Sequence, residues 1–112
     1  MQIRQITEDY SVAPQIGVEH VPLIAGAGFK SIVCNRPDDE DPGQPSVEII
    51  RKAAEEAGLA FRHLPVISGQ MTEDNARDQA ALLKELPKPV LAYCRSGTRC
   101  ANLHAAIQQM GL

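Results

Sequence analysis

The stretch "PVLAYCRSGTRCA", residues 89–101, decides how the rest of this sequence is interpreted. Residues 89–93 are apolar and begin at a proline, which is typical of a short buried strand. From Thr98 onward the apolar residues recur with helical spacing, at Leu103, Ala106, Ile107 and Met110. Cys94 therefore lies at a strand-to-helix junction between the two segments. Such a junction is either an anion-binding loop that carries a nucleophile or an ordinary turn after a buried cysteine.

The remaining sequence alternates between strand and helix patterns. Residues 3–6 and 10–14 predict a β-hairpin at the N-terminus, joined by a polar turn at 7–9. Further strands are expected at 29–33 and 59–67, although Pro65 ends the second or places it at an edge. Helices are expected within 18–27, where Pro22 delays the start, from Ser46 to Gly58, and from Thr72 to Lys88-Pro89. This order predicts an α/β fold over residues 1–112, with a mostly parallel central sheet flanked by helices.

Length, composition and charge are those of a single globular domain. The chain has 112 residues, of which 44% are hydrophobic and 22% charged. A net charge of -3 gives no electrostatic reason to bind nucleic acid or an anionic membrane. No segment approaches the roughly 18 apolar residues of a membrane span, and no signal peptide is evident. We therefore expect a cytoplasmic protein with three reduced cysteines, no metal site and no other cofactor.

The loop after Cys94 has the composition of an anion-binding site. Its small residues and the following helix N-terminus would direct backbone N–H groups at one point, and two arginines add positive charge. This setting lowers the pKa of a cysteine below its free value of about 8.5 and makes it a nucleophile at neutral pH. We expect Cys94 and Arg99 to be catalytic, and the residues between them to bind substrate: Arg95, Ser96, Gly97 and Thr98.

Two resemblances to known families follow from these residues. The run 93–99, "YCRSGTR", resembles the active-site loop of rhodanese-type sulfurtransferases. The N-terminal hairpin, "GFKSIVCNRPDDE" (28–40), "GQPS" (43–46) and "FRHLPV" (61–66) resemble the phosphatase-like domain of beta-lactamase-hydrolase-like proteins over nearly the whole chain. That resemblance implies the fold of dual-specificity phosphatases. It also implies a link to sulfide metabolism, with a sulfur-dioxygenase-type hydrolase as a possible partner.

The two families imply different reactions, and three features favour sulfur transfer. Four residues, 95–98, separate Cys94 from Arg99, whereas cysteine phosphatases have five. Tyr93 replaces the histidine usual in phosphatases, and residues 67–70 lack the aspartate acid that dual-specificity phosphatases place there. We therefore expect a sulfurtransferase that carries sulfane sulfur as a Cys94 persulfide. The donor would be thiosulfate, a polysulfide or a persulfide, and the acceptor glutathione or a protein cysteine.

Two other functions remain open from the sequence. One is a cysteine phosphatase that acts on phosphotyrosine or a small phosphoester. The other is a non-catalytic module that binds a partner in sulfide metabolism.

Several supporting residues have two interpretations. The resemblance makes Arg36 a candidate for lining the pocket and Asp38 a candidate partner of Arg36 or Arg99. For a phosphatase, Asp38 or Asp74 would be the candidate acid. Cys100 is either a resolving thiol for Cys94 or a small residue in helix packing. Cys34 either lies near the same edge of the sheet or, as we favour, is a buried small hydrophobic residue.

Overall fold

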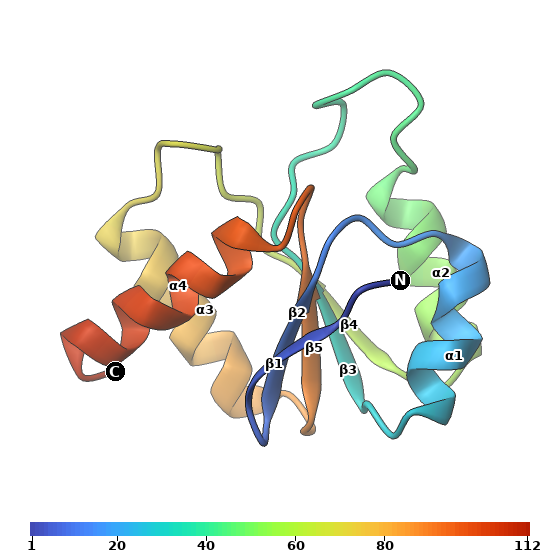
Figure 1. Cartoon of the computed structure of the whole chain (residues 1–112), viewed down its shortest axis with the longest axis horizontal. Coiled ribbons are helices and arrows are strands. Elements are labelled where there is room, and N and C mark those ends of the chain that lie inside the picture. Colours follow the sequence, from blue (N-terminus) through green and yellow to red (C-terminus); the bar gives the residue numbers. More distant parts are fainter.

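Five strands form one sheet in the computed structural model, which describes residues 1–112 (Figure 1). The strands are β1 (Arg4–Thr7), β2 (Tyr10–Ala13), β3 (Ser31–Cys34), β4 (Ala60–His63) and β5 (Val90–Tyr93). Their order is β1-β2-β5-β3-β4, and only β1 runs antiparallel to its neighbour. The predicted hairpin and mostly parallel sheet are therefore confirmed. The strand before Cys94 is the central one.

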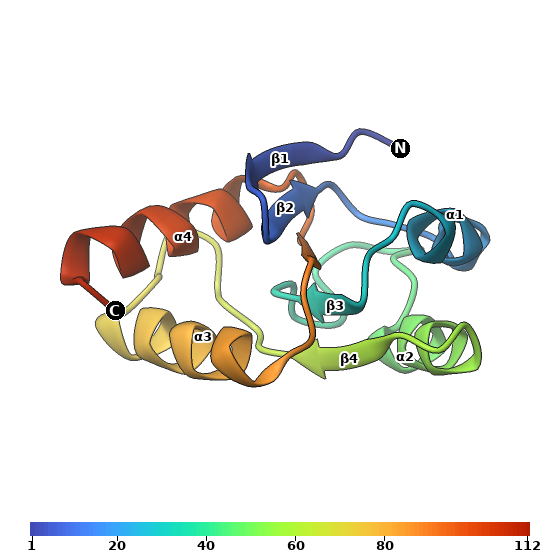
Figure 2. The same ribbon diagram turned by 90° about the horizontal axis from the view of Figure 1, so that it is seen from below.

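Four α-helices cover the two faces of this sheet (Figure 2). A 3₁₀ turn, Val18–His20, precedes α1 (Val21–Gly26), so the first helix begins after Val18 as Pro22 predicted. It shares one face with α2 (Val47–Glu56), while α3 (Glu73–Glu85) and α4 (Thr98–Met110) cover the other. None of these helices has the length and apolar character that a membrane span requires.

Helices α2 and α3 begin at the capping residues that the sequence predicts, Ser46 and Thr72. The Ser46 hydroxyl accepts a hydrogen bond from the N–H of Ile49 at 3.3 Å, and the Thr72 hydroxyl accepts one from Asn75 at 3.1 Å. These caps satisfy backbone donors that have no partner within the helix. Strand β4 is shorter than predicted: it ends at His63 instead of Ile67. Beyond His63 the N–H groups of Leu64 and Val66 still donate to the carbonyls of Cys34 and Asn35, at 2.9 and 3.0 Å, but the segment has no regular strand geometry. Pro65 is tolerated because β4 lies at the edge of the sheet.

Successive side chains of β5 belong to two different hydrophobic clusters, one on each face of the sheet. Leu91 and Tyr93 pack with α1 and α2, whereas Ala92 and Cys94 pack with residues of α3 and α4. Successive strand side chains point to opposite faces of a sheet, which explains the division. Cys34, at the end of β3, belongs to the α1/α2 side. Cys34 and Cys94 are therefore separated by the sheet.

Candidate active site

Cys94 follows the last residue of β5 and is fully buried beneath the loop. Its Sγ accepts a hydrogen bond from the N–H of Gly97 at 3.1 Å. Gly97 has φ of 90°, and a Cβ there would lie 3.4 Å from the carbonyl carbon and oxygen of Ala13. Both the left-handed backbone and this close approach favour glycine. The Gln15 N–H also donates to the Arg95 carbonyl at 3.2 Å, which joins the loop to the segment after β2.

The surroundings of Cys94 stabilise its thiolate. The pKa of Cys94 is lowered to about 5, and the largest cause is a hydrogen bond from the Cys100 thiol. Burial opposes this shift, while the backbone N–H groups of Cys100, Gly97 and Ser96 add to it. Burial raises the pKa of Cys100 well above its usual value, so Cys100 keeps its proton and acts as a donor. A thiol with this pKa is ionised at neutral pH, which is the form in which a cysteine can act as a nucleophile.

Arg99 is fixed by a two-point ion pair with Glu40. Its Nη1 lies 2.7 Å from Oε2 and its Nη2 2.9 Å from Oε1 of that carboxylate. Nη1 also donates to the Val66 carbonyl at 3.0 Å. Glu40 accepts a further hydrogen bond from Arg36 Nε at 2.9 Å. The pKa of Glu40 falls to about 2, chiefly because of the hydrogen bond from Arg99, so this residue remains a carboxylate.

A polar pocket of about 430 Å³ lies beside the loop. None of its lining residues is hydrophobic or acidic; they are Ser68, Gly69, Arg95, Ser96, Thr98, Arg99 and Asn102. The Arg95 side chain is 71% exposed, and its Nε lies 3.4 Å from Asp41 Oδ2. The Ser96 and Thr98 hydroxyls hydrogen-bond to each other at 3.0 Å. Two arginines in a pocket without a lining carboxylate favour an anionic ligand.

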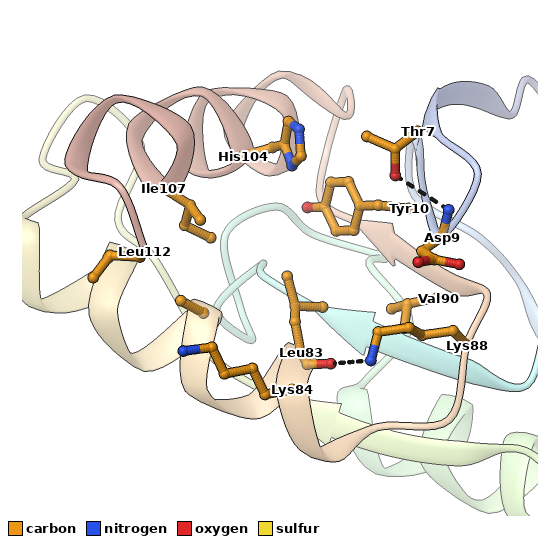
Figure 3. A pocket seen from close by; sticks show the side chains of 11 residues that line it. Thr7, Asp9, Tyr10, Leu83, Lys84, Lys88, Val90, His104, Ile107 and Leu112 are labelled. Atoms are coloured by element: carbon orange, nitrogen blue, oxygen red, sulfur yellow. Dashed lines mark hydrogen bonds between the residues drawn. The ribbon is translucent and has the colours of Figure 1, made fainter.

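A second hollow, of about 210 Å³, lies between α3 and α4 at the start of β2 and β5 (Figure 3). There His104 stacks on Tyr10, with ring centroids 5.3 Å apart, so this histidine is more than a solvent-facing residue of α4. The Lys88 ammonium donates to the Leu83 carbonyl at 3.0 Å. This hollow lies at the opposite end of β5 from Cys94, and its lining is largely apolar. The polar pocket is therefore the candidate active site.

The structure corrects the predicted role of Asp38. Its carboxylate accepts a hydrogen bond from the N–H of Val47 at 2.9 Å and thus caps α2, instead of contacting Arg36 or Arg99. Glu40 and Asp41 pair with the arginines in its place. Both residues were missed, although two acidic residues four and five positions after Arg36 were a signal for such pairing.

The other predicted residues lie outside the pocket lining. Arg36 is buried; its Nη2 lies 2.7 Å from Asp41 Oδ2, and it supports Arg99 only through Glu40. Asp74 pairs with Arg77 in the exposed first turn of α3. The Cys34 thiol donates to the Arg36 carbonyl at 3.3 Å on the other side of the sheet, consistent with a buried residue outside the site.

Comparison with known proteins agrees with this geometry. Residues 2–111 match the family model "Beta-lactamase hydrolase-like protein, phosphatase-like domain". Curated relatives of that name include one from Agrobacterium fabrum, 36% identical over 93% of this chain, and one from Xylella fastidiosa, 34% identical over 94%. This chain spans about a quarter of their length, 24% in both cases.

Solved structures of the same fold are described as phosphatases or candidate phosphatases. A candidate phosphatase from Neisseria meningitidis is 38% identical, with a TM-score of 0.86 over 92% of this chain and 73% of that one. Another, from Shewanella putrefaciens, has a TM-score of 0.82 over 97% of this chain and 69% of that one. It is only 18% identical, so it supports the fold alone.

The fold and the cysteine loop together define a phosphatase-like α/β domain of the dual-specificity type. Within that class, this chain belongs to the family of phosphatase-like domains found in beta-lactamase hydrolase-like proteins.

The expectation of a sulfurtransferase is wrong. The matching family and the similar structures are of the phosphatase type. The spacing argument failed because the four residues between Cys94 and Arg99 do not form the pocket alone. Ser68, Gly69 and Asn102 also line it, so the length of the loop alone does not set the width of the pocket.

Proposed function

We propose that this chain is a cysteine-dependent phosphatase that hydrolyses phosphomonoesters at Cys94. The observation that carries the proposal is a cysteine with a pKa of about 5 beside a pocket that two arginines line. Family membership and the structural similarity to the Neisseria meningitidis protein support the same chemistry.

Arg99 retains the donors that a phosphoryl group needs. A guanidinium has five N–H groups, and Glu40 and Val66 occupy both on Nη1 and one on Nη2. The free N–H groups are those of Nε and the remaining one of Nη2, which form an adjacent pair along one edge of the plane. Such a pair can bind two phosphoryl oxygens at once. Glu40 thus holds one edge of Arg99 and leaves the other for substrate.

The reaction has two steps in this proposal. The Cys94 thiolate attacks phosphorus, so an S–P bond forms while the ester P–O bond breaks and the leaving oxygen takes the electron pair. Loop N–H groups and Arg99 stabilise the charge on the phosphoryl oxygens. Water then attacks the phosphocysteine, which releases phosphate and regenerates the thiolate.

The pocket favours esters whose leaving group departs as a stable anion. No carboxylate lines it, and Glu40, with a pKa of about 2, holds no proton to donate near neutral pH. Neither Asp38, which caps α2, nor Asp74, which pairs with Arg77, is placed to supply one. Aryl phosphates such as phosphotyrosine meet this requirement, because a phenolate leaves with less need of an acid than an alkoxide does.

Hydrolysis of p-nitrophenyl phosphate tests the proposal. We expect turnover by the wild type, a phosphocysteine intermediate on acid quench, and loss of both in Cys94→Ser. Cys34→Ser is the matched control, because Cys34 is a buried cysteine outside the site, and it should retain activity. Absence of hydrolysis by the wild type, or equal rates in Cys94→Ser, would contradict the proposal.

We further propose that the domain acts in the cytoplasm, with a hydrolase of the sulfur-dioxygenase type as its partner. All three cysteines are free and buried, and unpaired cysteines are typical of a reducing compartment. Cell fractionation and co-purification with that hydrolase would test location and partner separately.

A further inference from the structure

A pair of buried amide side chains joins the end of β3 to α3. Asn35, which directly follows β3, and Gln79 of α3 are both fully buried, and the proposed reaction uses neither. Asn35 Nδ2 donates to Gln79 Oε1 at 3.0 Å, and Gln79 Nε2 donates to Asn35 Oδ1 at 3.0 Å. Buried amides are costly unless their polar atoms find partners, and two apolar side chains of the same shape fill such a space without that requirement. The other hydrogen bonds of Asn35 indicate a role beyond packing.

Asn35 connects the end of β5 to the segment that holds Arg99. Its N–H donates to the carbonyl of Tyr93, the last residue of β5, at 2.9 Å. Its carbonyl accepts a hydrogen bond from the N–H of Val66 at 3.0 Å, and its Nδ2 donates to the carbonyl of Leu64 at 2.9 Å. The Val66 carbonyl in turn accepts the hydrogen bond from Arg99 Nη1 at 3.0 Å. One residue therefore links the strand before the nucleophile to a partner of the arginine.

The position of residues 64–66 affects both Arg99 and the lining of the pocket. This segment follows the edge strand β4 without regular strand geometry, and Pro65 within it has no N–H to donate. Its hydrogen bonds to the end of β3 hold it in place. Ser68 and Gly69, which line the pocket, lie in the exposed stretch that follows. A shift of this segment would move a partner of the arginine and part of the pocket lining together.

We propose that Asn35, oriented by Gln79, is a positioning residue for Arg99. It sets where the Arg99 guanidinium lies relative to the Cys94 loop, and hence how tightly the pocket binds a phosphoryl oxyanion. Gln79 contributes because its donor to Oδ1 and its acceptor for Nδ2 hold the Asn35 amide plane, which keeps the second Nδ2 hydrogen on the Leu64 carbonyl. The phosphoryl ligand in this proposal rests on the phosphatase function proposed above, whereas the placement of the arginine does not.

The double variant Asn35→Leu/Gln79→Met tests this role. It replaces the amide pair by apolar side chains of similar size, so neither amide is left unpaired and we expect the chain to fold. Inorganic phosphate is titrated into this variant and into its parent by calorimetry, both in a Cys94→Ser background that lacks the charge of the thiolate. We expect the Kd for phosphate to rise about tenfold, which corresponds to one hydrogen bond to a charged group. An unchanged Kd would overturn the proposal.

Gln79→Met alone decides the matter if the double variant does not fold. It keeps the Asn35 side chain but removes the two bonds that orient its amide. We expect weaker phosphate binding than in the parent, although the loss should be smaller than in the double variant. Binding equal to that of the parent would count against the positioning role.

Ser31→Ala is the matched control. Ser31 is a fully buried polar residue at the other end of β3, and its hydroxyl donates to the Pro87 carbonyl at 2.7 Å. The variant removes a buried hydrogen bond of the same strand without touching the pocket lining. Its free energy of unfolding should fall while the Kd for phosphate stays unchanged. A rise in Kd as large as that of the double variant would show that lost stability, and not positioning, is the cause.

Crystal structures separate this proposal from the phosphatase function. In the wild type Arg99 Nη1 should lie on the Val66 carbonyl, and in the double variant these two atoms should lie beyond hydrogen-bond distance. If the contact is intact in the double variant, the positioning role is refuted even where the wild type hydrolyses p-nitrophenyl phosphate. If the contact is lost and the wild type hydrolyses no ester, only the phosphatase function is refuted.

Discussion

Replacing Glu40 by glutamine removes the charge that holds the two arginines behind the loop. Its carboxylate accepts three hydrogen bonds from guanidinium groups, one from Arg36 and two from Arg99. The Arg36 side chain is only 4% exposed, so the loss leaves a buried cation with Asp41 as its remaining charged partner. We expect Glu40→Gln both to destabilise the fold and to loosen Arg99 in the pocket.

The lowered pKa of Glu40 gives the loss of stability that we expect in Glu40→Gln. A fall from 4.5 to about 2 corresponds to about 3 kcal/mol of stability. The Glu40 side chain is 23% exposed, and solvent screening lowers this figure to about 2 kcal/mol. We therefore expect the free energy of unfolding of Glu40→Gln to be lower than that of the wild type by about 2 kcal/mol at pH 7. Loss of Arg99 orientation should also lower kcat/KM for an aryl phosphate about tenfold.

The stability that the Glu40 carboxylate contributes should decrease as the pH is lowered. Because the pKa of Glu40 is lower in the folded than in the unfolded protein, its contribution is complete above about pH 4.5 and is lost as the pH falls through about 2. The difference between wild type and Glu40→Gln should therefore be largest at neutral pH and shrink towards zero near pH 2. Urea unfolding of both proteins at several pH values measures it.

Glu48→Gln is the matched control. Glu48 also pairs with an arginine, Arg51 at 3.2 Å, but its side chain is 80% exposed on α2. Such a surface pair contributes about 0–1 kcal/mol, so this variant should unfold almost like the wild type. Equal stability of the two glutamine variants at pH 7 would refute the reasoning. A wild-type advantage over Glu40→Gln that persists undiminished at pH 2 would refute it as well.

Three further predictions concern the loop and its support. The rate of Cys94 alkylation by iodoacetamide should reach half its maximum near pH 5, because the thiolate forms above its pKa of about 5. Cys100→Ala should move this midpoint to a higher pH, because the Cys100 hydrogen bond is the largest cause of the lowered pKa. A wild-type midpoint near the pKa of a free cysteine would contradict the prediction. Gly97→Ala should lower the free energy of unfolding, measured in urea, by about 2 kcal/mol and should also lower activity. Gly58 has a similar positive φ but open space around it, so Gly58→Ala should lower the free energy of unfolding by about 1 kcal/mol and leave activity unchanged. Tyr10→Phe should lower the free energy of unfolding by about 1 kcal/mol, because it removes the buried hydrogen bond to the Cys100 carbonyl. An unchanged free energy of unfolding would show that this hydrogen bond contributes nothing to stability.

The architecture was predictable because its signals are local. Alternating apolar residues, prolines at the strand ends and the caps at Ser46 and Thr72 specify the hairpin, the parallel strands and two helices within a few residues each. The position of Cys94 at the end of the central strand followed from the same signals. Strand β4 was predicted too long because apolar residues continue past the point where its ladder ends.

The partners of Arg99 were not predictable in this way. Glu40 lies 59 positions away in the sequence and reaches Arg99 only because the acidic loop after β3 lies against the first turn of α4. In the sequence this loop contains four consecutive acidic residues, 38–41, and nothing local distinguishes the one that pairs with Arg99 from the one that caps α2. Only the folded chain separates their roles.

The spacing between cysteine and arginine was also the wrong measure of the chemistry. The position of Arg99 is determined by Glu40 on one edge of its guanidinium and by the Val66 carbonyl, and both lie outside the loop. The loop has only to direct its N–H groups towards Cys94, and Gly97 allows four residues to do so. Under the proposed function, a loop of four residues therefore suffices, because the fold around Arg99 places the arginine.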